Sequence, residues 1–170
     1  TYYGGGTHNN LSGQGMDAHV DFNYLDIPNI GKVHRRINII IYLNEEWKAD
    51  WGGVLNLHKN PWDPQNDKII SVVPTLNRMV MFETNEHSWH GFKPVSANIP
   101  HDATRKSIAL YFYTKERPQH EIAPEHGTFY VPSFPNISQW LAEERVSRRE
   151  YDELDMAFKH SLKLLKNQYA

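Results

Sequence analysis

Short runs of apolar and β-branched residues, separated by turn residues, follow one another through the first two thirds of the chain. The separating segments, such as DIPNIG and NPWDPQND, are rich in Gly, Pro, Asn and Asp, and the GGG at 4–6 is also expected to be a turn. The run INIIIYL is almost continuously apolar, which predicts a strand covered on both faces. We expect a sandwich, jelly roll or barrel, with strands at Ala18–Tyr24, Arg36–Leu43, Val54–His58, Ile69–Val73, Met79–Glu83 and Ser107–Thr114.

The pattern becomes helical after PSFPN at 132–136. Ser138 is expected to cap a short helix that ends near Glu144, and Ser147 forms a capping box with Glu150. After Glu150, apolar residues recur at helical spacing at Tyr151, Leu154, Phe158, Leu162 and Leu165, which predicts an amphipathic helix. We favour packing of this helix against a sheet over binding to a partner. We therefore expect one domain, with a core over 1–116 and a helical extension over 117–170.

Composition narrows the classes of function. A chain of 170 residues that is 39% hydrophobic can bury a sizeable core. The formal net charge is −2, so no basic field indicates nucleic acid or an anionic membrane, and no run approaches the length of a membrane span. Cysteine is absent, which excludes disulfides and thiolate metal sites and favours a cytoplasmic location. With ten histidines present, a metal would be held by imidazole and carboxylate groups.

The segment GMDAHVDFNY places a histidine and an aspartate two residues apart in a predicted strand. Residues i and i+2 of a strand share a face, so His19 and Asp21 could converge on one metal ion, although a simple His–Asp hydrogen bond would leave the same pattern. Downstream, HSWHGF offers His87 and His90. We favour His90, because the following Gly91 allows close backbone approach. Two histidines and one carboxylate form the facial triad of non-haem Fe(II).

A further pair of polar residues occurs in TRKSIALYFYT, where Arg105 and Ser107 also share a strand face. A guanidinium and a hydroxyl that both point inward would suit a dicarboxylate, because arginine binds a carboxylate through two parallel hydrogen bonds. The phenol of Tyr42 could reach the same carboxylate. The alternatives are an arginine at a strand edge that reaches water and a buried tyrosine bonded to backbone.

These motifs, in this order, resemble the Fe(II)/2-oxoglutarate-dependent oxygenases, nearest to the prolyl-4-hydroxylase-like branch. HVDFNY, HRRINIIIYLNEEWKADWGGVLNLH and RKSIALYFYT carry the resemblance, which covers 3–114. It implies a mainly β, double-stranded β-helix core of the jelly-roll or cupin type, with the C-terminal helices packed outside. It also implies that iron is held by His19, Asp21 and His90, and that Arg105 binds the far carboxylate of 2-oxoglutarate with help from Tyr42 and Ser107.

The resemblance further implies an activity. The expected reaction hydroxylates an unactivated C–H bond and converts 2-oxoglutarate to succinate and CO₂, with Fe(II), 2-oxoglutarate and O₂ as cofactors and ascorbate in a supporting role. Peptidyl-proline is the first expectation for the substrate, and a small molecule such as an amino acid or a sugar is the alternative. The insertion SANIPHDA is expected to be a loop near the mouth of the site, with tryptophans on nearby loops as substrate platforms: Trp47, Trp51 and Trp62.

Two other classes of protein remain open. A non-catalytic binding module of the cupin type could keep the same His/Asp set for a structural metal. A zinc hydrolase could use it as well, since two histidines and a carboxylate also bind zinc. Neither class explains an arginine directed at the metal, so an inward-facing Arg105 would favour the oxygenase.

Overall fold

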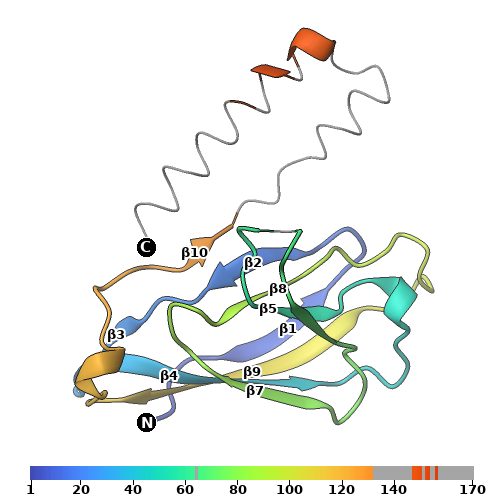
Figure 1. The fold of residues 1–170 in the computed structure, drawn as a ribbon. Coiled ribbons are helices and arrows are strands. Elements are labelled where there is room, and N and C mark those ends of the chain that lie inside the picture. Colours follow the sequence, from blue (N-terminus) through green and yellow to red (C-terminus); the bar gives the residue numbers. More distant parts are fainter. Residues whose placement is uncertain (64, 132–146, 151, 154–155, 157–170) are drawn as a thin grey trace. The chain divides into compact units, whose positions relative to one another are not determined.

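The computed structural model describes residues 1–63, 65–131, 147–150, 152, 153 and 156. Its strands form two sheets, and every described strand pair is antiparallel (Figure 1). The first sheet has the order β1 (Gly6–Asn10), β9 (Arg105–Thr114), β4 (Gly31–Tyr42) and β3 (Tyr24–Ile27), and β7 (Met79–Glu83) pairs with the second half of β4. The second sheet has the order β10 (Phe129–Tyr130), β2 (Met16–Val20), β8 (Trp89–Phe92), β5 (Leu55–His58) and β6 (Ile69–Val72).

The chain passes back and forth between these sheets, and one cavity is lined by residues of both. Strand β1 lies in the first sheet, β2 in the second, β3 and β4 in the first, and β5 and β6 in the second. This alternation confirms the mainly β fold of the double-stranded β-helix or jelly-roll type. Two short 3₁₀ helices, η1 (Ala49–Trp51) and η2 (Gln119–Glu121), lie in the connections.

The predicted strands differ from the observed ones mainly at short strands of two to five residues. Strand β7 has the predicted bounds, whereas β4 begins at Gly31 instead of Arg36. Strand β1, with the sequence GTHNN, was expected to begin with a turn, but it forms five residue pairs with β9. Strands β3, β8 and β10 were not predicted either. Pairing with a neighbouring strand makes these short segments extended, and each is too short for its own pattern to indicate a strand.

The expectation that INIIIYL is covered on both faces is wrong. Ile37 is 36% exposed, while Asn38 and Tyr42 are buried. A β-bulge in β4 sets which residues face inward: Arg35 pairs with Tyr113 and Ile37 with Phe112, so one extra residue lies between two consecutive partners. The bulge reverses the alternation of buried positions, and therefore two polar residues three positions apart, Arg35 and Asn38, are both buried between the sheets.

The chain divides into two compact units, Thr1–Val131 and Pro132–Ala170. Residues 117–131, which the sequence assigned to the extension, contribute η2 and β10 to the first unit. In the second unit the capping box is confirmed, because the Ser147 N–H donates to Glu150 Oε2 at 2.8 Å and the Glu150 N–H donates to Ser147 Oγ at 3.3 Å. The expected helix at 138–144 and the apolar positions after Glu150 lie outside the described residues, and so does their expected packing outside the core.

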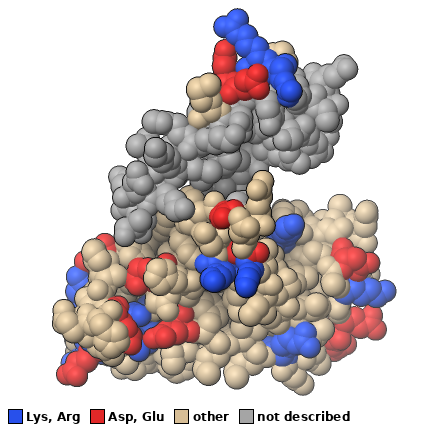
Figure 2. Space-filling model, viewed as in Figure 1, with Lys and Arg blue, Asp and Glu red and all other residues tan. Residues whose placement is uncertain are grey.

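The described surface carries charges of both signs. Basic and acidic side chains are interspersed on the face that Figure 2 shows, in line with the small net charge. Within the residues that the structure describes, no helix is long and apolar enough to cross a membrane.

Candidate metal and cosubstrate site

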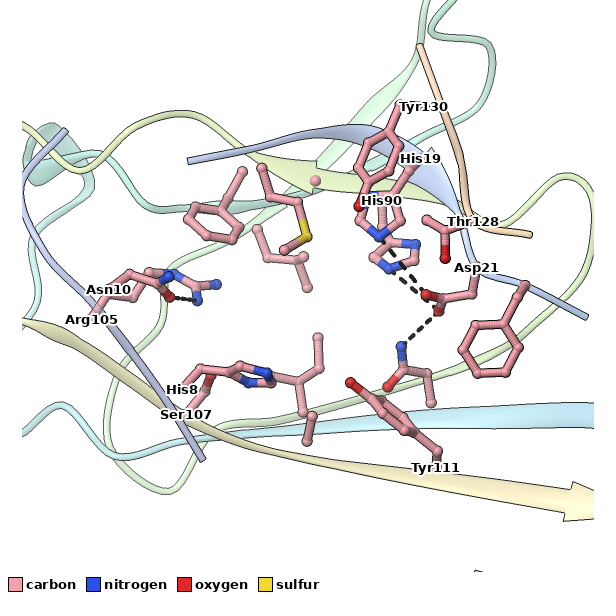
Figure 3. A pocket seen from close by; sticks show the side chains of 18 of the residues that line it. His8, Asn10, His19, Asp21, His90, Arg105, Ser107, Tyr111, Thr128 and Tyr130 are labelled. Carbon is pink, nitrogen blue, oxygen red and sulfur yellow. Dashed lines mark hydrogen bonds and ion pairs between the residues drawn. The ribbon is translucent and has the colours of Figure 1, made fainter. Parts of the chain in front are cut away.

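Three potential metal ligands converge on neighbouring strands of the second sheet. His19 on β2 lies directly opposite His90 on β8, and Asp21 is the first residue after β2. His19 Nε2 is 3.9 Å from Asp21 Oδ1, and His90 Nε2 is 3.7 Å from Asp21 Oδ2 (Figure 3). All three side chains are buried, and one ligand atom from each lies within 4.8 Å of the others. Within the described part of the chain, no other group of His, Asp or Glu side chains meets this spacing.

Close contact between β2 and β8 holds the two histidines face to face. A Cβ atom at Gly91 would lie only 2.7 Å from the carbonyl oxygen of Met16, so a larger residue would push the strands apart. This confirms the close approach expected from the glycine after His90. His87 is exposed in the preceding turn and does not belong to the cluster.

The hydrogen bonds of the two rings leave one nitrogen of each free to bind a metal. His19 Nδ1 is 2.8 Å from the carbonyl oxygen of Asp17, and His90 Nδ1 is 2.8 Å from that of Ser88. A carbonyl oxygen only accepts, so Nδ1 carries the hydrogen and Nε2 keeps its lone pair. Burial and the nearby His19 lower the pKa of His90 to about 4, so this ring is neutral at pH 7. The donor set therefore fits a divalent cation.

Two polar residues that the sequence did not predict contact Asp21. The guanidinium of Arg35 lies 3.0 Å from Asp21 Oδ2 through Nη2, and Asn38 Nδ2 donates to the same oxygen at 3.1 Å. Both residues are almost fully buried and line the cavity. Arg35 Nε and Asn38 Oδ1 have no hydrogen-bond partner within the described chain. Sequence patterns missed this pair because the bulge in β4, which turns both side chains inward, leaves no mark in the residue types.

The same cavity, of about 280 Å³, extends to Arg105 and Ser107 on β9. Figure 3 shows Arg105 on the opposite side of the cavity from the cluster of His19, Asp21 and His90. Arg105 Nε donates to the carbonyl of Gly53 at 2.6 Å, and Nη2 donates to the hydroxyl of Tyr42 at 3.3 Å.

Arg105 is a buried cation without an acidic partner among the described residues. It is 3% exposed, its guanidinium lies 4.0 Å from the ring centre of Phe92, and no ion pair joins it to a described carboxylate. Burial lowers the pKa of Arg105, as expected for an uncompensated charge. A buried charge is costly unless it is paired. This end of the cavity therefore fits an anionic group of a ligand.

Ser107 and Tyr42 have different positions relative to the cavity. Ser107 is buried and lines it, whereas Tyr42 is fully buried and is absent from its wall. The Tyr42 hydroxyl accepts from Arg105, and burial raises the pKa of this phenol. Tyr42 therefore contacts the guanidinium from behind, while Ser107 faces the enclosed space.

The three tryptophans expected as substrate platforms do not line the cavity. The indole N–H of Trp47 donates to the carbonyl of Gly52 at 2.9 Å, and its ring meets Trp51 edge to face. Trp62 packs on Trp89 in the same manner. None of the three predicted platform residues lines the cavity, and neither does any residue of the SANIPHDA loop.

Two residues from the C-terminal end of the first unit do line the cavity, although the sequence indicated no chemistry there. Tyr130 on β10 places its ring 5.0 Å from that of His19, and Thr128 lies just before this strand. Strand β10 pairs with β2 at His19, which brings both residues to the end of the cavity where His19, Asp21 and His90 lie. The sequence offered no signal for them, because a two-residue strand has no periodicity to detect.

Two known proteins are similar to this chain in sequence. The chain is 39% identical over 89 residues to prolyl 3,4-dihydroxylase OGFOD1 of Ostreococcus tauri, which is 49% of this chain and 17% of that protein. It is 33% identical over 108 residues to prolyl 3-hydroxylase OGFOD1 of Mus musculus, which is 62% of this chain and 18% of that protein. The chain thus spans less than a fifth of the length of these two relatives.

A solved structure and a family model complete the comparison. The structure is a prolyl hydroxylase from Trichoplax adhaerens in complex with a hypoxia inducible factor oxygen degradation domain peptide fragment, with a TM-score of 0.43 and 30% identity, covering 62% of this chain and 40% of that chain. The model of the 2OG-Fe(II) oxygenase superfamily matches residues 5–113, which include both strands of the histidine pair as well as Arg105 and Ser107. The chain belongs to the 2OG-Fe(II) oxygenase superfamily.

Proposed function

We propose that this chain is a dioxygenase that hydroxylates an unactivated C–H bond and couples this to conversion of 2-oxoglutarate and O₂ to succinate and CO₂. Family membership supports the reaction class and its cofactors, Fe(II), 2-oxoglutarate and O₂. The observation that carries the proposal is the single cavity with a His/Asp/His cluster at one end and an arginine without an acidic partner at the other. A binding module or a zinc hydrolase would have no use for that second feature.

In this proposal His19, Asp21 and His90 hold the metal. Two imidazoles and one carboxylate match the donor set that non-haem Fe(II) takes in oxygenases. The bound metal with its cosubstrate would supply the oxidising power that amino-acid side chains lack. The protein's own contribution is to bond each Nδ1 to a backbone carbonyl, which directs both Nε2 atoms to the metal, and to enclose the site between the two sheets.

Arg105 would bind the distal carboxylate of 2-oxoglutarate. Its guanidinium is fixed by Gly53 and Tyr42, so little side-chain freedom is lost when the carboxylate arrives. Ser107 would donate its hydroxyl to the same carboxylate from the cavity wall. Tyr42 would act by positioning Arg105, since its hydroxyl is bonded to the guanidinium.

A prolyl residue in a peptide is the substrate that we propose first. The support is the names of the two relatives, a prolyl 3,4-dihydroxylase and a prolyl 3-hydroxylase. A free amino acid or a sugar is the alternative within the same reaction class. A supporting role of ascorbate and a cytoplasmic location stay predictions, as does a single domain with a helical C-terminal extension.

The test is release of succinate from 2-oxoglutarate by purified protein, which uncoupled turnover permits even without the true substrate. We expect release only when Fe(II), 2-oxoglutarate and O₂ are all present, and none from the variant Asp21→Ala. Proline-containing peptides and free proline should then be compared for stimulation of release. Succinate release that does not depend on Fe(II), or that persists in Asp21→Ala, would contradict the proposal.

A further inference from the structure

The carboxylate of Asp21 has two oxygens in very different surroundings. Oδ2 accepts hydrogen bonds from Asn38 and lies against the guanidinium of Arg35. Oδ1 takes no hydrogen bond from a described residue and lies 3.9 Å from His19 Nε2, while Oδ2 also lies 3.7 Å from His90 Nε2. Oδ2 is therefore held by protein side chains, whereas Oδ1 keeps its lone pairs available.

Arg35 is itself held in place from several sides. Its guanidinium carbon lies 3.9 Å from the ring centre of Tyr111 and 4.6 Å from that of Phe22, so the cation is enclosed between two aromatic rings. Its backbone N–H donates to Asn23, and its carbonyl accepts from Arg117. With 2% exposure, the side chain is shielded from bulk solvent. The contact with Asp21 is therefore part of a rigid frame.

We propose that Arg35 is a positioning residue of the metal site, which acts by orienting the carboxylate of Asp21. Asn38 orients the same carboxylate through its hydrogen bond to Oδ2. By occupying Oδ2, the pair presents Oδ1 alone to the metal, so that the carboxylate takes one coordination position. A carboxylate that turned and bound through both oxygens would take two positions, and one fewer would remain for cosubstrate and oxygen. Outer partners that orient a ligand in this way commonly change metal affinity about 10- to 100-fold when removed.

This inference rests on the proposed function, because it assumes that Asp21 is a metal ligand. The bulge in β4 supplies independent support: it turns Arg35 and Asn38 inward together, at a spacing that a regular strand would place on opposite faces. Phe22 and Tyr111, the two rings around Arg35, also line the cavity, so the frame extends from the arginine to the site itself.

The test is the affinity for Co(II) alone, measured by titration and by its visible absorption, which responds to the number and arrangement of ligands. Arg35→Met removes the donors and the charge but keeps much of the volume. We expect its affinity for Co(II) to fall about 10- to 100-fold with a changed spectrum. Arg36→Met is the matched control, because the neighbouring Arg36 pairs with Glu83 and Glu121 away from the cavity, and its affinity should stay within about twofold of wild type.

A double-mutant cycle separates positioning from a general loss of structure. In the background of Asp21→Asn, which removes the charge that Arg35 contacts, adding Arg35→Met should change Co(II) affinity by less than about twofold. Arg35→Lys, which keeps a cation, should recover part of the loss seen for Arg35→Met. If Arg35→Met fails to fold, Asn38→Leu tests the same coupling, with a smaller expected loss.

The outcomes separate the inference from the proposed function. Equal losses from Arg35→Met in both backgrounds, or an unchanged or increased affinity in the wild-type background, would overturn the positioning role while the metal site stands. If Asp21→Asn and His90→Ala both bind Co(II) as wild type does, the metal site itself is wrong, and the proposed function falls with it.

Discussion

Replacement of Arg105 offers the sharpest test of the cosubstrate end of the cavity. In the described structure this guanidinium is buried without a carboxylate partner and is bonded only to neutral groups, Gly53, Tyr42 and Asn10. An arginine in this state is ready to receive a carboxylate. Arg105→Ala removes the one cation at that end of the cavity among the residues that line it.

The expected loss of 2-oxoglutarate affinity follows from the burial of Arg105. Removing one partner of a buried charge pair costs about 3–5 kcal/mol, because the other charge is left uncompensated. Since each 1.4 kcal/mol is a factor of ten, 2-oxoglutarate should bind about 10²- to 10⁴-fold more weakly to Arg105→Ala. Arg105→Lys should lie between the variant and wild type, because an ammonium keeps the charge and loses the paired hydrogen bonds.

Binding is best measured without turnover, by calorimetric titration of 2-oxoglutarate into protein loaded with Mn(II) under nitrogen. The affinity for Mn(II) itself should hardly change, since Arg105 does not contact the ligand cluster. Lys106→Ala is the matched control: this neighbouring cation is exposed, and alternation along β9 directs it away from the cavity. Its affinity for 2-oxoglutarate should match wild type within about twofold.

Loss of the Arg105 charge should weaken cosubstrate binding but stabilise the protein when no cosubstrate is bound. Without cosubstrate the buried charge of Arg105 is uncompensated, so Arg105→Met is expected to raise the melting temperature of the metal-free protein while it abolishes the stabilisation that added 2-oxoglutarate gives to wild type. Unchanged affinity for 2-oxoglutarate in Arg105→Ala would refute the reasoning. It would leave a metal-binding jelly roll with no case for an oxygenase.

Three further predictions concern the ligand histidine, the contact between β2 and β8, and the carboxylate of Asp67, which is bonded to His58 and Asn60. His90→Ala should abolish succinate release that depends on Fe(II), whereas His87→Ala should keep most of it; an inactive His87→Ala would show that the distal ligand has been misassigned. Gly91→Val should lower the melting temperature and metal affinity together, because its side chain would meet the carbonyl of Met16, and wild-type values for both would contradict the close strand contact. Burial raises the pKa of Asp67, but hydrogen bonds from a backbone amide and a histidine outweigh this and leave it below its usual value. A depressed carboxyl pKa contributes stability above the unfolded value of about 4 that is lost as the pH falls through the folded pKa, so Asp67→Asn should destabilise the protein at pH 7 and flatten the pH dependence of urea unfolding below pH 4.

The chemistry of the site could be anticipated from the sequence because strand geometry is regular over two residues. The spacings of His19 and Asp21, and of Arg105 and Ser107, report a shared face as soon as a strand is recognised. A glycine after His90 similarly indicates close approach, because only a residue without a side chain fits there. Such local signals depend on a few neighbouring residues, so they survive without knowledge of the fold.

Tertiary structure decided the features that depend on pairing between distant strands. The polar segment GTHNN became β1 only because β9 supplies its hydrogen bonds, and β10 reaches His19 from more than a hundred residues away. The bulge in β4 reversed the inward and outward positions, and that reversal brought Arg35 and Asn38 to Asp21. A bulge depends on the register of the partner strand, and the sequence of one strand does not contain that register. The sequence by itself therefore determined the proposed ligand set and the proposed cosubstrate arginine, and only the packed sheets determined which residues hold those groups in place.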